Sequence, residues 1–203
     1  MTRRRLSRIL VSCGMTMLIL TSCYYFAIPA RRDPSVVTRD LLIDETALPV
    51  GWSAGDLYTI RPGTGGHEGD EALVVEFRGP RLPEGQDFAA HRIFRFKNAT
   101  LAANAYKRMQ GDILFFGETE DYGRHPEDWQ YRSSIANDWR FACVVERCGV
   151  IARYDEFVSS FGAYMTTPSM TPAALENALK AIDQRMAEKL NKKPAATPTS
   201  NPN

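Results

Sequence analysis

The chain has 203 residues, of which 44% are apolar and 24% are charged, so its size fits one globular domain with extensions at its ends. The formal net charge is +1, and no cluster of lysine and arginine follows Arg32. Nucleic-acid binding depends on such clusters, so the composition argues against a nucleic-acid partner.

The N-terminus has the pattern of a bacterial lipoprotein signal peptide. Four arginines between positions 3 and 8 precede an uncharged run of twelve residues, 9–20, which is shorter than the roughly 20 apolar residues that cross a bilayer. The next residues, "LTSC" at 20–23, resemble the lipobox, in which the chain is cleaved before a cysteine that then carries lipid. The pattern predicts a signal peptide at residues 1–22 and a diacylglyceryl group on the sulfur of Cys23.

A transmembrane helix is the alternative interpretation of this segment. The uncharged stretch 9–30 is long enough to span a bilayer, and the arginines before it would hold its N-terminus in the cytoplasm. The lipobox is favoured because its four positions match where the apolar run ends. Under both interpretations the residues after about 31 lie outside the cytoplasm and are tethered to a membrane, which in a cell with two membranes includes the outer membrane as an option.

The expected domain boundaries follow from this N-terminus. Removal of residues 1–22 would leave 21 basic and 24 acidic side chains, a formal net charge of −3. Residues 23–40 are expected to hold the lipidated cysteine and a short linker. A single α+β extracytoplasmic domain is expected at 41–190, and residues 191–203 have no apolar period, so they are expected to form a disordered tail.

Alternation of apolar and polar residues predicts strands in the first half of the domain. In the clearest run, His91 and Ile93 alternate with Arg92 and Phe94. An apolar segment, "LLIDETALPVGW", precedes the strands and ends in a Pro and Gly bend. The three strands are expected at 52–60, 71–78 and 89–97.

Helix and strand signals continue to residue 190. Asn98 or Thr100 is expected to cap a helix that runs to about Phe115, and Thr171 followed by Pro172 is expected to begin a second helix. Four further strands are expected between the helices, at about 129–135, 138–145, 148–154 and 157–165. The predicted order is β-β-β-α-β-β-β-β-α, an antiparallel meander with one or two helices packed on one face.

The pair Cys143 and Cys148 is expected to form a disulfide. Exported domains fold in oxidising compartments, and the two cysteines stand at the end of a predicted hairpin. A redox-active pair usually has Cys-x-x-Cys spacing at a helix N-terminus, which this pair lacks. A metal site would need further ligands close by in the sequence, and there are none.

Three histidines are the remaining candidates for chemistry. His67 lies in a Gly-rich turn, and His125 lies in a loop rich in carboxylates, so both are weak candidates for metal ligands. His91 lies in a predicted strand, where a hydrogen-bonded structural histidine is favoured over a catalyst. No serine fits G-x-S-x-G, so no catalytic residue, metal site or cofactor is predicted.

The tryptophans and tyrosines form a generous aromatic set, most of which is expected in the core. Those that line a groove would suit an apolar ligand or a protein partner. The set includes Trp52, Trp129, Trp139, Tyr58, Tyr122, Tyr131, Tyr154 and Tyr164.

Several segments resemble a family of uncharacterised bacterial exported lipoproteins. They are "LLIDETALPVGW", the cysteine hairpin leading into "IARYDEFVSSFGAYM", and "MTPAALENALKAIDQRMAEKL". The family implies export and a lipid anchor but no activity. The "LPVGW" segment also resembles extracellular sensor domains attached to bacterial Ser/Thr kinases, although these 203 residues include no kinase domain.

The sequence therefore favours a lipid-anchored domain on the extracytoplasmic face of a cell membrane that binds a protein or small-molecule ligand without catalysis. The alternative is a secreted-side hydrolase or metal-dependent enzyme that uses His67, His125 and nearby carboxylates. These two histidines must converge in the fold for the alternative to hold. A disulfide exchanger is a third hypothesis, and it requires a reactive thiol at Cys143 or Cys148.

Overall fold

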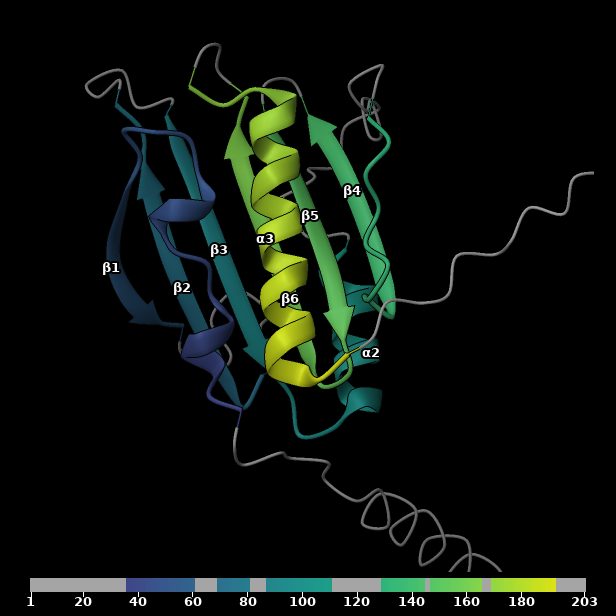
Figure 1. Ribbon diagram of the computed structural model, residues 1–203. Coiled ribbons are helices and arrows are strands. Elements are labelled where there is room, and N and C mark those ends of the chain that lie inside the picture. The colour runs from purple at the N-terminus through teal and green to yellow at the C-terminus, as the bar shows by residue number, and fades with distance from the viewer. Residues whose placement is uncertain are drawn as a thin grey trace, which may run out of the picture. The chain divides into compact units, whose positions relative to one another are not determined.

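The computed structural model describes residues 36–60, 69–80, 87–110, 129–144, 147–165 and 169–192. These residues form one antiparallel sheet with helices packed against it (Figure 1), and all belong to one compact unit, Arg32–Asn203. The elements in chain order are η1 (Thr38–Leu41), η2 (Glu45–Ala47), β1 (Ser53–Thr59), β2 (Glu71–Arg78), β3 (Phe88–Arg95), α2 (Ala99–Met109), β4 (Asp138–Val144), β5 (Arg147–Tyr154), β6 (Phe157–Tyr164) and α3 (Pro172–Leu190).

The sheet consists of two three-stranded meanders joined at their last strands. Its spatial order is β1-β2-β3-β6-β5-β4, and every neighbouring pair is antiparallel. β3 and β6 are therefore the central strands, and β1 and β4 are the edges. The predicted α+β class, with an antiparallel meander and a packed helix, is confirmed.

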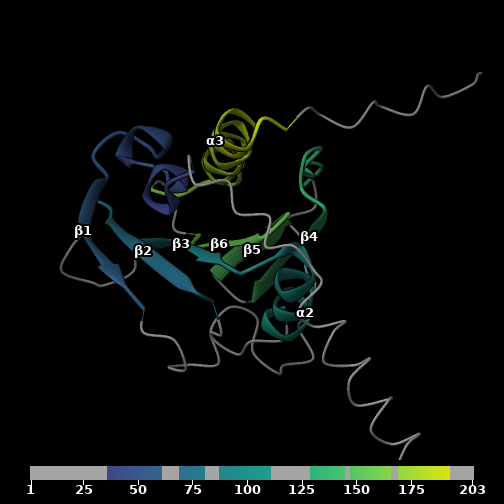
Figure 2. The same ribbon diagram turned by 90° about the horizontal axis from the view of Figure 1, so that it is seen from below.

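The two α-helices cover opposite faces of the sheet, as the view along the sheet shows (Figure 2), so the expectation that both pack on one face is wrong. We call these the α3 face and the α2 face. Successive side chains of a strand point to opposite faces, so the alternating residues of β3 divide between the α3 face and the α2 face. His91 and Ile93 lie on the α3 face, and Phe94 packs under α2.

α3 begins and ends where its capping residues dictate. The hydroxyl of Thr171 accepts a hydrogen bond from the backbone N–H of Ala174, and Pro172 occupies the first turn, as predicted. Asn191 ends the helix in the left-handed conformation, at φ 51°. The buried stripe of α3 packs on the sheet through Leu175, Ala178, Leu179, Ile182, Asp183 and Met186.

α2 is a shorter helix with a narrower contact. The Asn98 side chain accepts from the N–H of Leu101 at 2.9 Å and caps its start. The helix ends at Met109, before the expected end at Phe115, and residues 111–115 lie outside the described part of the chain. Its buried side chains are Ala102, Ala105, Tyr106 and Met109.

The expected linker at 23–40 is wrong for its last residues, because the packed domain already includes residue 36. Val36 is 8% exposed and Thr38 is fully buried. The Arg95 guanidinium donates to the Val36 carbonyl at 2.9 Å, and the Thr38 hydroxyl donates to the Glu71 carboxylate. These side-chain partners come from strands distant in sequence, so the polar appearance of residues 31–40 did not reveal them.

The strand expected at 129–135 is absent, since residues 129–137 have no ladder partner in the described sheet. The Trp129 indole N–H bonds to the Tyr131 carbonyl at 2.9 Å, and the Ser133 hydroxyl accepts from the N–H of Ala136. The Tyr131 hydroxyl donates to Asp183 of α3 at 2.6 Å. Local side-chain bonds of this kind satisfy the backbone without a neighbouring strand.

Cys143 and Cys148 form the expected disulfide, with an S–S distance of 2.01 Å, and they are direct partners in the β4–β5 ladder. Both sulfurs lie in the core of the α3 face. Of the predicted tail, Asn191 and Lys192 are ordered against the domain, where the Lys192 ammonium donates to the Asn137 side chain at 2.8 Å. Within the described residues, no helix combines the length and the apolar character that a bilayer span requires.

Candidate ligand-binding site

A row of small residues crosses the α2 face of the sheet. The strand registers pair Ala90 of β3 with Gly162 of β6, Gly162 with Gly149 of β5, and Gly149 with Ala142 of β4. Side chains on these four positions are a methyl group or a hydrogen atom. The row therefore places no side chain larger than a methyl group between the rows of larger side chains on either side.

Larger side chains border the Ala90 and Gly162 end of this row and form a pocket of about 180 Å³ with it. We call this pocket the trough. On one side the ladder places Tyr164 opposite Arg147, and Phe88 precedes the first residue of β3 that pairs with β6. On the other side lies Arg92. The residues that line the trough are Phe88, Ala90, Arg92, Arg147, Gly162, Ala163 and Tyr164.

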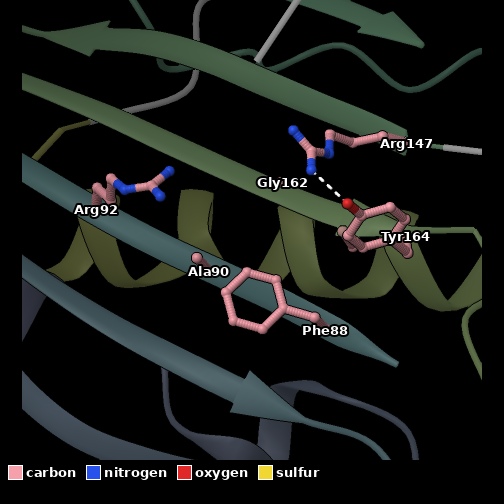
Figure 3. Close-up of a pocket in the computed structure, with 7 residues that line it drawn as sticks. Phe88, Ala90, Arg92, Arg147, Gly162 and Tyr164 are labelled. Carbon is pink, nitrogen blue, oxygen red and sulfur yellow. Dashed lines mark hydrogen bonds between the residues drawn. The ribbon is translucent and has the colours of Figure 1, made fainter. Parts of the chain in front are cut away.

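The two arginines of the trough extend toward each other over its floor. Figure 3 shows the guanidinium groups of Arg92 and Arg147 directed from opposite sides toward the space above Gly162, with Phe88 beside Tyr164. Arg147 donates from Nη2 to the Tyr164 hydroxyl oxygen at 2.5 Å, and its Cζ lies 4.7 Å from the centre of the Tyr164 ring. This contact fixes Arg147 against one wall.

The α2 face carries an excess of positive charge. Across β2 to β6 the alternation places on it five arginines, one glutamate and one aspartate, namely Arg78, Arg92, Arg140, Arg147, Arg153, Glu76 and Asp138. Asp138 is bonded to Arg153 at 2.5 Å, away from the trough. Glu76 accepts a hydrogen bond from Tyr58 at 2.6 Å, and burial together with this carboxylate raises the pKa of Tyr58 to about 12.

Ser160 adds an unsatisfied hydroxyl next to this floor. It precedes Gly162 by one strand repeat on the same face, and it is the ladder partner of Arg92. Its side chain is 1% exposed, and its Oγ has no hydrogen-bond partner among the described residues. Buried hydroxyls are nearly always bonded, so such an atom marks a position where a further polar group fits.

The chemistry available in the trough is that of binding an anion beside an apolar surface. Guanidinium groups match planar oxyanions, and aromatic rings with alkyl or glycine floors favour a flat apolar body. Among the described residues, the side chains that line the trough include no carboxylate, cysteine or histidine. These side chains offer positive charge and apolar surface to a ligand.

His91, the one predicted histidine within the described residues, is structural. Its Nδ1 accepts from the N–H of Ile43 at 3.1 Å, and its Nε2 lies 2.9 Å from the Ser159 hydroxyl. The ring is fully buried on the α3 face. Burial lowers the pKa of His91 to about 3, and the positive charges of Arg185 and Arg92 add to this effect.

The other predicted site residues lie outside the described residues: Cys23, His67 and His125 all fall there. The expected convergence of His67 and His125 therefore stays a prediction. Within the described ranges, no group of three or more His, Cys, Asp or Glu side chains is placed to hold a metal ion.

Part of the predicted aromatic set lines an open groove at the β4 edge. Trp129 stacks on Phe141 with ring centroids 4.2 Å apart, and Tyr131 meets Trp139 edge to face at 5.7 Å. The groove is lined by Trp129, Gln130, Tyr131, Arg132, Trp139, Arg140 and Phe141. These aromatic side chains pack mainly on one another and on the α3 core, so the groove offers less apolar floor than the trough.

Sequence reasoning missed the trough because its parts are far apart in the chain. The residues that line the trough come from three strands, and its floor residues Ala90 and Gly162 are small for no reason visible in the local sequence. One signal was present: Gly149 and Gly162 each interrupt a strong β-strand pattern, and a glycine inside a strand often marks the close approach of another group. Tyr164, a member of the predicted aromatic set, does line the pocket.

Comparison with known proteins adds a single similarity. No protein-family model matches the chain, and a search of curated proteins gives no match. Among solved structures, the extracellular domain of PknH from Mycobacterium tuberculosis is similar over 79% of this chain and 96% of that chain, with 12% sequence identity and a TM-score of 0.42. Structures at this TM-score need not share a fold, so the function of this chain is argued from its own residues.

Proposed function

We propose that this protein is a lipoprotein anchored through Cys23 to the extracytoplasmic face of a cell membrane, and that its α+β domain binds a small ligand in the trough without catalysis. The trough carries this proposal. It combines a floor of small residues, one wall with two aromatic side chains and two convergent arginines in one pocket.

Two features support the location. The arginines, the uncharged run and "LTSC" at 20–23 have the order of a lipoprotein signal. The disulfide between Cys143 and Cys148 suits an oxidising compartment, where such bonds persist. A disulfide directly across a ladder also supports a structural role for these cysteines over thiol exchange.

The anchor is tested by the intact mass of the protein extracted from membranes, for the wild type and for Cys23→Ala. We expect a chain that begins at Cys23 with added acyl mass, and loss of that mass in the variant. A full-length, unmodified chain in both preparations would contradict the anchor and would favour a membrane-spanning segment at residues 9–30.

Binding is tested on the same extracted protein with two matched probes, benzoate and benzamide, followed by the backbone amide NMR signals of Ala90 and Gly162. We expect at least one probe to shift these signals saturably. Gly162→Leu, and independently Ala90→Leu, fill the trough and should abolish the shifts while the urea unfolding midpoint shows that each variant is folded. Shifts that survive in both folded variants would contradict the trough as the site.

A further inference from the structure

We infer that β1 is an interaction surface through which two copies of this chain pair, edge to edge, into one continuous sheet. The surface consists of the outer side of β1 with the exposed side chains of Leu57 and Tyr58, and we call it the β1 edge. It belongs to a different part of the molecule from the trough, so a dimer at this edge goes beyond the proposed function.

The two edges of the sheet differ in how they are covered. At the β4 edge, residues 129–131 lie along the strand, joined to it by two aromatic pairs, Trp129 with Phe141 and Tyr131 with Trp139. β1 forms the other edge (Figure 1), and within the described part of the chain no strand pairs with its outer side. All seven residues of β1 are exposed. β1 is therefore the edge that presents its backbone.

The second half of β1 has backbone groups that point away from the sheet. The N–H of Ile60, the residue after β1, donates to the Ala72 carbonyl of β2 at 3.0 Å. Backbone groups of successive residues in a strand point to alternate sides. Those of Tyr58 therefore also point to β2, and those of Leu57 and Thr59 point outward. An outward row of N–H and C=O groups is a template for another strand.

β1 lacks most of the features that keep strand edges apart. Exposed edges are commonly protected by lysines, prolines or bulges. The strand "SAGDLYT" has no lysine or proline, and its single charged residue is Asp56. A register shift between Ala54 and Leu57 disturbs the first half, whereas Leu57 to Thr59 pair regularly with β2. The regular half of β1 is therefore suited to further pairing.

Exposed apolar side chains also concentrate at this edge. Among the described residues five large apolar side chains are exposed, and three of them lie in β1 or in the turn before it: Val50, Leu57 and Tyr58. Leu57 is 37% exposed and Tyr58 is 43% exposed. A strand added to β1 would cover part of both, and the burial of apolar surface favours association.

A second copy of β1 matches these features in one antiparallel register. Leu57 of each copy forms a hydrogen-bonded pair with Thr59 of the other, because the backbone groups of both residues point outward. Tyr58 then lies opposite Tyr58 of the second copy, and directly opposed aromatic residues stabilise strand pairs. Asp56 faces Ile60, and the two Asp56 residues are about 13 Å apart along the strands, beyond the screening length of about 8 Å. No like charges meet.

The symmetry of this pairing places the two chains on one side of the joined sheet. The two-fold axis is perpendicular to the sheet, so both α3 faces point the same way. Val36 and Leu41, at the start of the described domain, belong to the α3-face core. Both domains are therefore entered from the same side, as two copies on one membrane require. The contact is smaller than the roughly 20–30 residues per side of a standard interface, so we expect a weak dimer.

The register is tested by a disulfide across the two-fold axis in the membrane-bound protein. Tyr58→Cys places two cysteines in a pair whose Cα atoms are about 4.5 Å apart, within disulfide reach, so mild oxidation should give a covalent dimer. Ala54→Cys is the matched control, since this residue is also exposed in β1 but its two copies would lie about 26 Å apart. Wild type oxidised in parallel accounts for the native cysteines.

Self-association is tested by sedimentation of the membrane-extracted protein in detergent. We expect the mass to rise toward two copies as the protein concentration increases. Leu57→Lys places a charge at the edge and should weaken association about tenfold or more. Leu101→Lys makes the same change at a residue of α2 that is 38% exposed, and it should leave association unchanged. Thermal unfolding shows that both variants are folded.

Four outcomes would overturn the inference. The first is a protein that stays monomeric and gives no crosslink with Tyr58→Cys. The second is equal crosslinking by Ala54→Cys, which would indicate random collision. The third is association that Leu57→Lys does not weaken more than Leu101→Lys does. The fourth is slow hydrogen exchange of the Leu57 and Thr59 amides in a monomer, which would mean that another segment covers β1. None of these outcomes affects the probe experiment on the trough.

Discussion

The two faces of the sheet are formed by the same strands, but the α3 face is covered more completely than the α2 face. On the α3 face a core of large apolar side chains surrounds a few bonded polar groups: His91 bonds to Ile43 and lies against Ser159, and Asp183 accepts from two tyrosines. On the α2 face the core cluster under the helix is smaller, and the trough lies beside it. The difference indicates that the α3 face is closed around an apolar core, while the α2 face retains a pocket that a ligand can use.

Helix length explains most of this difference. α3 has 19 residues and α2 has 11, which at 1.5 Å per residue gives lengths of about 28 Å and about 16 Å. A strand of eight residues, such as β6, spans about 26 Å. α3 therefore runs the full length of the strands, whereas α2 covers only the part near Phe94, Ile151 and Val158. The trough lies outside this covered part, where β3 begins at Phe88 and β6 ends at Tyr164.

The largest expected effect comes from removing one phenyl ring on each face. Phe161 is fully buried on the α3 face, and Phe161→Ala should lower the free energy of unfolding by about 3–5 kcal/mol, the usual result of a large core cavity. Phe88 is half-buried at the trough, so Phe88→Ala should cost about 1 kcal/mol or less. Urea denaturation measures the free energy of unfolding of both variants. Equal losses would show that the two faces do not differ in their contribution to stability.

The next effect tests the polar network under α3. The Asp183 carboxylate accepts from the hydroxyls of Tyr131 and Tyr154, each at 2.6 Å, and burial with this charge raises the pKa values of both tyrosines. Asp183→Ala should lower the free energy of unfolding by about 2–3 kcal/mol, because it leaves the buried Tyr154 hydroxyl without this acceptor. Adding Tyr154→Phe should cost less in this background than in the wild type. Additive losses would show that the pair is not coupled.

A pH titration sharpens the comparison through His91. Its pKa is about 3 in the folded protein and about 6.5 when unfolded, so between these values the unfolded chain binds the extra proton. Stability from this group is complete above pH 6.5 and falls as the pH decreases, by about 1.4 kcal/mol per unit, or about 2 kcal/mol by pH 5. His91→Gln should remove this part of the pH dependence of the free energy of unfolding, measured by urea denaturation at pH 6.5 and at pH 5. An unchanged slope would mean that other groups cause it.

The smallest expected effect comes from the disulfide. Cys143 and Cys148 are separated by five positions, so the loop they close is short, and the chain-entropy model gives only about 2 kcal/mol. Replacing both with alanine should lower the unfolding midpoint modestly and leave benzoate binding in the trough unchanged, since both sulfurs lie on the α3 face. Loss of binding in a folded variant would show that the two faces are coupled.

The local elements could be predicted from the sequence, but their assembly could not. Thr171 and Pro172 begin α3 as expected, β2 occupies the predicted residues, and the disulfide forms, because caps, alternation and cysteine spacing are encoded within a few positions. Which face each helix covers depends on the packing of distant strands. The trough depends on register: Ala90, Gly162 and Arg147 come together only after β3, β6 and β5 pair. No local pattern contains that information.

The start of the domain was likewise not predictable from its local sequence. Residues 31–40 are polar and resemble a linker, yet Val36 and Thr38 are buried by partners in β3 and β2. The expected strand at 129–135 failed for a related reason. Its apolar residues were correctly assigned to the interior, but Tyr131 and Trp129 reach it from an irregular segment that contacts α3 and β4.

The pinned N-terminal segment has a mechanical consequence. Val36 is held by Arg95, the N–H of Ile43 by His91, and Asp44 by Arg185 of α3 at 2.8 Å. Tension applied to the chain before Val36 is thus delivered to the central strand β3 and to α3. It does not reach the edge strands β1 and β4 first, although an edge strand is the part of a sheet that peels away most easily. Forced extension from this end must rupture several side-chain contacts in turn before any strand is released.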